Sequence, residues 1–443
     1  MGGRKGGRRP KGGDDGQGGS RRGKKKGGHG GGGKDQGPTL KEAQRLEQKA
    51  EKNGSRGKYS EQALAGFRQA IDLYLALYDG GAGPAAEECL VGLAGCYMGS
   101  AECKAGYLST LTHVTQEGPV KAEARFLAQQ CSECYRKLLQ RTDLEDREEV
   151  LVNLGNALSV WAENAETGPE VIELLGKALS AYDESLSIRS DDADTHLNRG
   201  DLLQKMAEEL ADSGDHVQSR RAFAEANSAY EACCSVTDSI KGDDLVGLLE
   251  SWGANLLGMA QSEGCGPEER RELLGKALGH LTEATAMEVT ATRAMNTIGD
   301  CHVAMAETVG LGPQQRLGHL EQAVAAGYQR ALAVDRSNLD ASVGVAEVHA
   351  MSGKAFREAG DVAAASTHFA AAAAGYERIF ADQELWRDFG GCADRSDFLY
   401  NAACACALAG RPSEARQALE MCLSFGLVTQ EEIVKEEDLR CCL

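Results

Sequence analysis

The sequence has few residues that break a helix or favour a strand. Of its 443 residues only 8 are proline, and aromatic residues make up 5%. Most of the chain is instead a long succession of Ala, Leu, Glu and Arg, whose unbranched or small side chains lose little rotamer freedom in a helix. The composition therefore predicts helices and argues against a protein built mainly from strands.

The sequence also lacks long hydrophobic runs. No stretch approaches the ~18 consecutive apolar residues of a membrane span, and between Met1 and Leu40 there is no large apolar residue. This argues against a secretory signal and leaves an organelle presequence without its apolar face. Fifteen cysteines are present, but without a secretory signal we expect reduced thiols rather than a disulfide framework. The sequence predicts an intracellular protein, cytoplasmic or nuclear or both.

Charge divides the chain into two unlike parts. Residues 1–35 hold 11 Lys and Arg against 3 Asp, a net charge of +8. The rest holds 37 basic and 64 acidic residues, a net charge of −27. Such an asymmetry concerns partners rather than fold.

The glycine-rich segment 1–38 has no apolar surface to bury, so we expect it to be a disordered tail. It carries two basic groups that could bind anions or an import receptor: Arg8, Arg9 and Lys11, then Arg21, Arg22, Lys24, Lys25 and Lys26. Three interpretations stay open, namely a solubilising extension, contact with RNA phosphates and nuclear import. No aromatic residue is interleaved for base stacking, so binding to nucleic acid would be electrostatic and salt-dependent.

Internal repeats are the strongest signal in the remaining sequence. The segment Glu-Leu-Leu-Gly-Lys-Ala-Leu occurs at residues 173–179 and again at 272–278, which indicates a repeated unit. Two helical patterns alternate along the chain. In the first pattern, a large residue lies four positions after one small residue and three positions before another. The large residues are Phe67, Tyr135, Tyr182, Tyr230, Leu281, Tyr328 and Leu419. In the second pattern, a small residue lies between bulky ones. The small residues are Ala94, Gly155, Gly200, Gly253, Gly299 and Ala403.

Offsets of three and four keep these residues on one face of each helix, where the small ones let a neighbouring helix approach. The two patterns resemble the two helices of the tetratricopeptide repeat, and the resemblance covers essentially residues 40–440. It implies an all-α, right-handed superhelical solenoid of antiparallel helical hairpins, which binds partners on its concave face. We expect about eight hairpins within residues 39–443 and a capping helix near 429–440.

The spacing of the repeats is longer than the 34 residues usual in that family. Gly155 and Gly200 are 45 residues apart, Gly200 and Gly253 are 53, and Gly253 and Gly299 are 46. The surplus predicts helices of about 20 residues, each ~30 Å long. Gly264, Gly266-Pro267 and Gly312-Pro313 are expected to form turns between paired helices.

No residue pattern typical of catalysis, metal binding or a cofactor is found. Cys131 and Cys134 form a single pair, whereas a closed zinc site needs four ligands, and Cys131 occupies a small-residue packing position. Cys233 and Cys422 occupy the same position, which favours cysteine as a small apolar residue. His302 lies at a packing position without a nucleophile or carboxylate motif nearby. We therefore expect no enzyme, no cofactor and no metal site.

Three asparagines are candidates for gripping a peptide backbone. The resemblance implies this role for Asn156 and Asn198, and Asn153 lies one turn before Asn156. In the chaperone-binding subset of the family, lysines and an arginine complete a clamp for a terminal carboxylate. Here Val152 and Leu197 occupy the matching sites, so the clamp is incomplete. Peptide gripping and simple solvation of the three asparagines both stay open.

Two functions follow as hypotheses. In the first, the protein is a non-enzymatic scaffold or adaptor that holds extended or basic segments of partner proteins. In the second, the basic tail contacts RNA phosphates while the array recruits other proteins. The oligomeric state is left open.

Overall fold

The computed structural model describes residues 39–54, 60–78, 84–107, 114–236, 242–382, 385–386, 389, 392–425 and 439. The predicted tail, 1–38, lies outside the described residues. So does the predicted capping helix near 429–440, apart from Leu439. Throughout the described part, the regular elements are helices.

The helices alternate between two layers, and each helix of the first layer is followed by one of the second. The first helices are α1 (Leu40–Gly54), α3 (Pro84–Tyr107), α5 (Arg147–Glu163), α7 (Ala193–Asp212), α9 (Asp243–Gln261), α11 (Thr292–Ala306), α14 (Leu339–Glu358) and α17 (Cys392–Leu408). The second helices are α2 (Glu61–Leu77), α4 (Val114–Leu139), α6 (Gly168–Ile188), α8 (His216–Val236), α10 (Pro267–Met287), α15 (Val362–Ala381) and α18 (Pro412–Phe425). In the sixth pair, α12 (Pro313–Gln322), the π-helix η2 (Ala323–Tyr328) and α13 (Gln329–Val334) together form the second helix.

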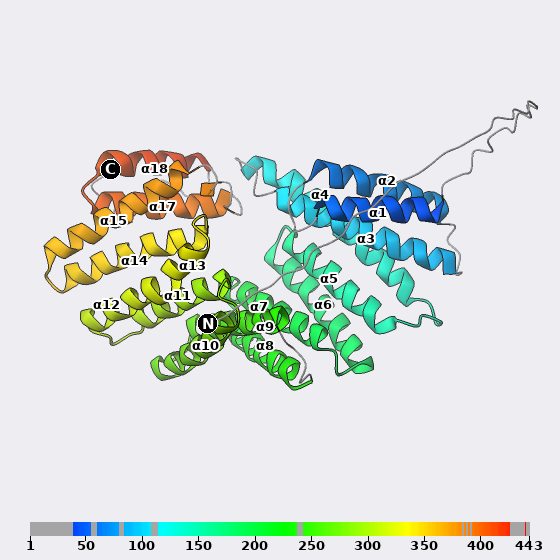
Figure 1. Cartoon of the computed structure of the whole chain (residues 1–443), viewed down its shortest axis with the longest axis horizontal. Helices are drawn as coiled ribbons and strands as arrows, with labels where there is room; N and C mark the ends of the chain where they lie inside the picture. Colours follow the sequence, from blue (N-terminus) through cyan, green and yellow to red (C-terminus); the bar gives the residue numbers. More distant parts are fainter. Residues whose placement is uncertain are drawn as a thin grey trace, which may run out of the picture. The chain divides into compact units, whose positions relative to one another are not determined.

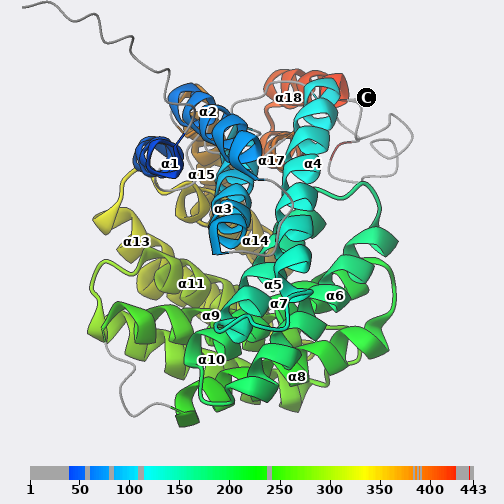
Figure 2. The ribbon, with the colours of Figure 1, turned by 90° about the vertical axis from the view of Figure 1, so that its right-hand side faces the viewer.

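Each pair is an antiparallel hairpin, and successive hairpins lie side by side (Figure 1). We number them 1 to 8 in chain order, from α1–α2 to α17–α18. Every second helix packs on its own first helix, and those of hairpins 1 to 7 also pack on the first helix of the next hairpin. The same succession is visible from the side (Figure 2). The predicted fold class, an all-α solenoid of antiparallel helical hairpins, is confirmed.

Glycine closes most of the hairpins in the described part. Five turns between a first helix and its second helix contain a glycine at positive φ, a conformation that costs glycine little. These glycines are Gly214, Gly264, Gly310, Gly360 and Gly410, with φ between 74° and 93°. After three of these turns the next helix begins at proline, namely Pro267, Pro313 or Pro412. The turns predicted at Gly264, Gly266-Pro267 and Gly312-Pro313 are confirmed.

The small and large residues of the two patterns meet inside the hairpins. A Cβ atom on Gly155 would lie 2.4 Å from a ring carbon of Tyr182, and one on Gly200 would lie 2.6 Å from Tyr230. Gly253 faces Leu281 and Gly299 faces Tyr328 in the same way. The predicted register of the paired helices is therefore confirmed from hairpin 3 to hairpin 6.

The helices are as long as the repeat spacing predicts: those of hairpins 3 to 5 have 17 to 21 residues. Cys131, Cys233 and Cys422 are at most 1% exposed, so these cysteines act as small core residues. Burial also raises the pKa of each of the three thiols, which keeps them protonated and unreactive at neutral pH.

Candidate functional site

The residue that follows the small glycine of a first helix has a fixed role in three hairpins. It accepts a hydrogen bond from the hydroxyl of the tyrosine that packs on the glycine. The Oη–Oδ1 distances are 2.6 Å for Tyr182 and Asn156, 2.8 Å for Tyr230 and Asp201, and 2.6 Å for Tyr328 and Asp300. In hairpin 5 both partners are absent together, because Leu281 and Ala254 occupy the two positions. The tyrosines therefore hold polar acceptors at equivalent places along the array.

Two of these acceptors, Asn156 and Asp201, line a cavity of about 420 Å³. The cavity is formed mainly by the first helices of hairpins 2, 3 and 4. Its walls are Met98 and Glu102 of α3; Asn156, Ser159, Val160 and Glu163 of α5; Tyr182 of α6; and Asn198, Asp201, Leu202 and Lys205 of α7.

Acidic groups outnumber basic ones in this cavity. Glu102, Glu163 and Asp201 contribute carboxylates, and the only cation among the lining residues is Lys205, which pairs with Glu163. Glu102 and Asp201 are solvent-exposed and have no ion-pair partner in the described part of the chain. The cavity therefore offers two accessible carboxyl groups whose charge no neighbouring cation balances by direct contact.

The surrounding protein disfavours the charged form of both carboxyl groups. Loss of hydration beside the protein raises the pKa of Glu102, and the nearby charge of Glu163 adds to this effect. The pKa of Asp201 is raised by the same desolvation, although hydrogen bonds from Tyr230 and Ser251 and the charge of Arg293 oppose the shift. A cation placed in the cavity would stabilise both carboxylates, because opposite charge favours the ionised form.

The structure brings two of the three predicted asparagines together. Asn156 and Asn198 line the cavity, whereas Asn153 is half-buried on α5 and is not one of the lining residues. The predicted tail residues, from Arg8 to Lys26, lie outside the described residues. The sequence interpretation missed Glu102, Glu163, Asp201 and Lys205. The position directly after the small glycine would have indicated Asp201.

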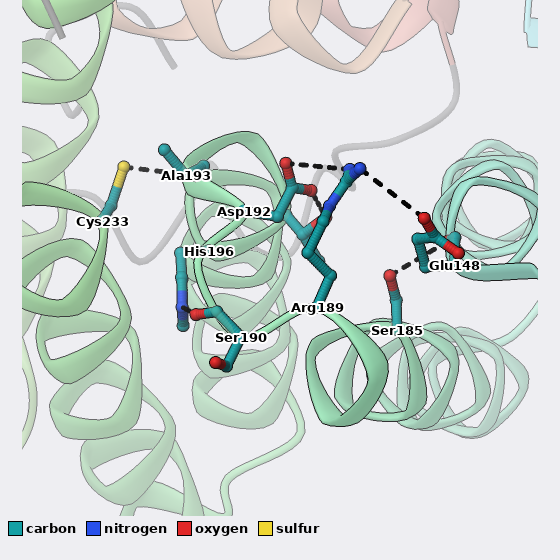
Figure 3. A network of polar contacts seen from close by, with 9 residues as sticks. Glu148, Ser185, Arg189, Ser190, Asp192, Ala193, His196 and Cys233 are labelled. Carbon is teal, nitrogen blue, oxygen red and sulfur yellow. Dashed lines mark hydrogen bonds and ion pairs between the residues drawn. The ribbon is translucent and has the colours of Figure 1, made fainter. Parts of the chain in front are cut away.

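Contacts near the α6–α7 loop join hairpins 3 and 4 (Figure 3). The first helices of these two hairpins line the cavity. Arg189 bridges Glu148 of α5, at 3.7 Å, and Asp192 at the start of α7, at 3.2 Å. Ser185 donates a hydrogen bond to the carbonyl of Glu148 at 3.0 Å. Further contacts run from Cys233 to the carbonyl of Ala193 and between His196 and the carbonyl of Ser190. Arg189 thus connects α5, one wall of the cavity, to the start of α7, which forms another.

The residues that accept the tyrosine hydrogen bonds lead to a stability prediction. A substitution of the acceptor in hairpin 6 and the reverse substitution in hairpin 3 serve as controls for each other. Desolvation raises the pKa of Asp300 above its ordinary 3.8, and Asp340 adds to the shift while the bond from Tyr328 opposes it. Since folding then disfavours the carboxylate, its charge costs stability above the folded-state pKa and costs nothing below 3.8. Asp300→Asn, which keeps an acceptor for Tyr328, should raise the free energy of unfolding at pH 7 by up to about 1 kcal/mol.

The gain should shrink as the pH falls from 7 toward 4, and thermal unfolding across this range measures it. The reverse change, Asn156→Asp, should lower stability at pH 7, because it places a carboxylate next to Glu102, Glu163 and Asp201. If both changes shifted the melting temperature in the same direction, the assigned cost of the charge would be wrong.

A second cavity, of about 100 Å³, lies among α15, α17 and α18. Apolar side chains, including Tyr376, Phe398 and Met421, form most of its wall. It is too small and too apolar to orient a polar segment. We take the acidic cavity as the candidate site because it combines carboxyl groups with Asn156 and Asn198.

None of the helices in the described residues is both long and apolar enough to cross a membrane.

No family model matches the sequence, and no curated protein matches it. Solved structures are similar to it at low identity. A tetratricopeptide repeat protein from Parabacteroides merdae is 12% identical, and the match covers 74% of this chain and 99% of that protein, with a TM-score of 0.41. YrrB, described as a TPR protein with an unusual peptide-binding site, is 17% identical, covering 58% and 96%, with a TM-score of 0.32. A human IFIT1 dimer with PPP-AAAA is 13% identical, covering 87% and 95%, with a TM-score of 0.31.

Proposed function

Since the chain is an array of tetratricopeptide-like hairpins, we propose that it is a non-catalytic scaffold that holds an extended, basic segment of a partner protein in the acidic cavity. The observation that carries the proposal is the pair of exposed carboxyl groups, Glu102 and Asp201, in a cavity of about 420 Å³. This volume lies within the range of roughly 300 to 1,000 Å³ that ligand pockets occupy.

The lining residues divide into groups with different roles in this proposal. Glu102 and Asp201 receive a lysine or arginine side chain, whose charge restores the ionisation that desolvation disfavours. The amides of Asn156 and Asn198 provide donors and acceptors for the peptide backbone. Met98 and Leu202 offer apolar surface to the aliphatic stem of the basic side chain.

Lys205 limits what the cavity accepts. Its ion pair with Glu163 removes one of the three acidic charges and places a cation at the wall. A segment with alternating basic and neutral residues therefore fits better than an unbroken basic run, because a second cation near Lys205 would be repelled.

Fluorescence anisotropy with three labelled peptides tests this function. The peptides share one neutral extended sequence and differ only in two central positions, which carry Lys, Gln or Glu. The full chain should bind the Lys peptide most tightly and the Glu peptide least, and the difference should narrow as salt is raised from 50 to 300 mM. Equal affinity for all three peptides would contradict the proposal.

The basic clusters of residues 1–35 favour a second function, in which the tail binds RNA while the array holds a protein. Its net charge of +8 predicts an affinity that falls steeply with salt, because binding releases counterions from the phosphates. Titrating a single-stranded RNA with the full chain, and with a variant in which Arg21, Arg22 and Lys24 to Lys26 are Gln, measures this. Equal binding at two salt concentrations would exclude the role.

A further inference from the structure

Histidine replaces a buried apolar pair in two consecutive hairpins. In hairpin 3, Leu158 lies three residues after the small glycine of α5 and packs in one core cluster with Leu174 of α6. Leu256 and Leu273 form the equivalent pair in hairpin 5. The matching positions hold His302 and His319 in hairpin 6, and His349 and His368 in hairpin 7. These four imidazoles lie at positions that hold leucine in hairpins 3 and 5.

The two histidine pairs have different geometries. His302 and His319 are stacked, with ring centroids 6.2 Å apart and planes inclined by 29°. In hairpin 7 the rings are tilted by 53°, and the Nδ1 atoms of His349 and His368 approach to 3.2 Å. Phe356 packs on His368 with centroids 5.1 Å apart and limits the movement of that ring. Two ring nitrogens therefore lie close together in hairpin 7.

A nitrogen–nitrogen separation of 3.2 Å fits two ligands of one metal ion. Zinc binds imidazole nitrogen at about 2.0–2.1 Å with tetrahedral angles, which places two such nitrogens roughly 3.3 Å apart. Burial also lowers the pKa of both imidazoles, which favours the neutral form that binds metals. Both side chains are only half-buried, so an ion has access from solvent.

We propose that His349 and His368 form a two-imidazole site for a divalent transition metal ion of the zinc class. No group of three or more His, Cys, Asp and Glu side chains is placed to hold a metal within the described ranges, so water fills the remaining positions of the ion. Glu321 of α12 is exposed, and its charge acts on His368, so it adds negative potential beside the site. The ion would join the two helices of hairpin 7.

Imidazole ligands select among metals in a known order. The affinity of the site should rise from Ni²⁺ to Cu²⁺ and be lower again for Zn²⁺, and Mg²⁺ and Ca²⁺, which prefer oxygen ligands, should not bind. Because the metal binds the folded hairpin, saturating Zn²⁺ should also raise the melting temperature, whereas Mg²⁺ should not.

Isothermal titration of the tag-free full chain with ZnCl₂ tests the site. The background carries Cys234→Ser, because Cys234 is an exposed thiol that could bind zinc. Binding to wild-type hairpin 7 should be saturable, and His349→Gln and His368→Gln should each weaken it at least 10-fold. His302→Gln, at the equivalent position of hairpin 6, should leave it unchanged.

The double change His349→Leu with His368→Leu separates loss of the site from loss of folding, since it restores the leucine pair of hairpins 3 and 5. It should keep the helical circular dichroism of the wild type and lose the zinc binding. The proposal is overturned if zinc binding survives this double change. It is also overturned if the wild type shows no saturable binding up to 1 mM Zn²⁺, because the two rings would then be joined only by an N–H···N hydrogen bond.

Discussion

Gly327→Ala is expected to lower the free energy of unfolding by about 2–3 kcal/mol, a large effect for the addition of one methyl group. Gly327 lies in η2, where the second helix of hairpin 6 packs directly on the backbone of α11. A Cβ atom at this position would lie 2.5 Å from the nitrogen of Gly299, 2.6 Å from its Cα and 2.9 Å from the carbonyl oxygen of Met295. These are backbone atoms, so no rotamer change relieves the overlap and the two helices must separate.

Gly318→Ala is the matched control, because it makes the same substitution in the same hairpin. Gly318 is exposed in α12, and no atom lies within 4 Å of the position of an added Cβ. Alanine should therefore stabilise the chain by about 0.5–1 kcal/mol through its higher helix propensity. Urea unfolding followed by circular dichroism measures both variants. If the two substitutions changed the midpoint in the same direction, the close approach at Gly327 would not exist in solution.

The packing of one large residue on one small residue explains why so much of the fold could be predicted from the sequence. A pattern of one large residue opposite one small residue is local in each helix, and it repeats, so several copies fix its phase. Gly155 and Tyr182, or Gly299 and Tyr328, are therefore recognisable although 27 to 29 residues separate them. The helix turns follow from glycine and proline, whose backbone preferences do not depend on the rest of the chain.

The features that could not be predicted depend on how one helix is aligned with another, which the sequence of a single helix does not show. His368 lies eight residues before Tyr376, but His319 lies nine residues before Tyr328, and the π-helix Ala323–Tyr328 absorbs the extra residue. Because of that insertion the two histidine pairs do not align in the sequence. Glu102 was missed because it enters the cavity from the preceding hairpin, so its role depends on how hairpins 2 and 3 pack.

Asp201 was missed for a different reason. It follows Gly200 as Asn156 follows Gly155, and both accept a hydrogen bond from the tyrosine of their own hairpin. The resemblance to tetratricopeptide repeats directs attention to asparagine at this position. The physical role there is that of an oriented acceptor, which a carboxylate fills equally well while adding charge. Asparagine and aspartate at this place thus set how acidic each step of the array is.

Changing Glu102 to Lys together with Asp201 to Asn should weaken binding of the basic peptide roughly 100-fold, since two contacts of about 1.4 kcal/mol each are lost. The pair is chosen to leave the fold intact. Glu102 is exposed, and Asn at position 201 still accepts the hydrogen bond from Tyr230, as Asn156 does from Tyr182. Because desolvation raises the pKa of both carboxyl groups, removing their charge should not destabilise the folded chain.

Glu268→Lys with Glu283→Gln provides the matched control. It makes the same change in net charge on α10, and both glutamates are exposed and lie outside the residues that line the cavity. Long-range attraction of a basic peptide should fall equally in the two double variants, so only the cavity variant should lose the additional, short-range part of the affinity. Anisotropy titrations at 50 and 300 mM salt separate the two parts. Equal weakening in both variants would mean that the whole acidic body attracts the peptide and that the cavity does not bind it.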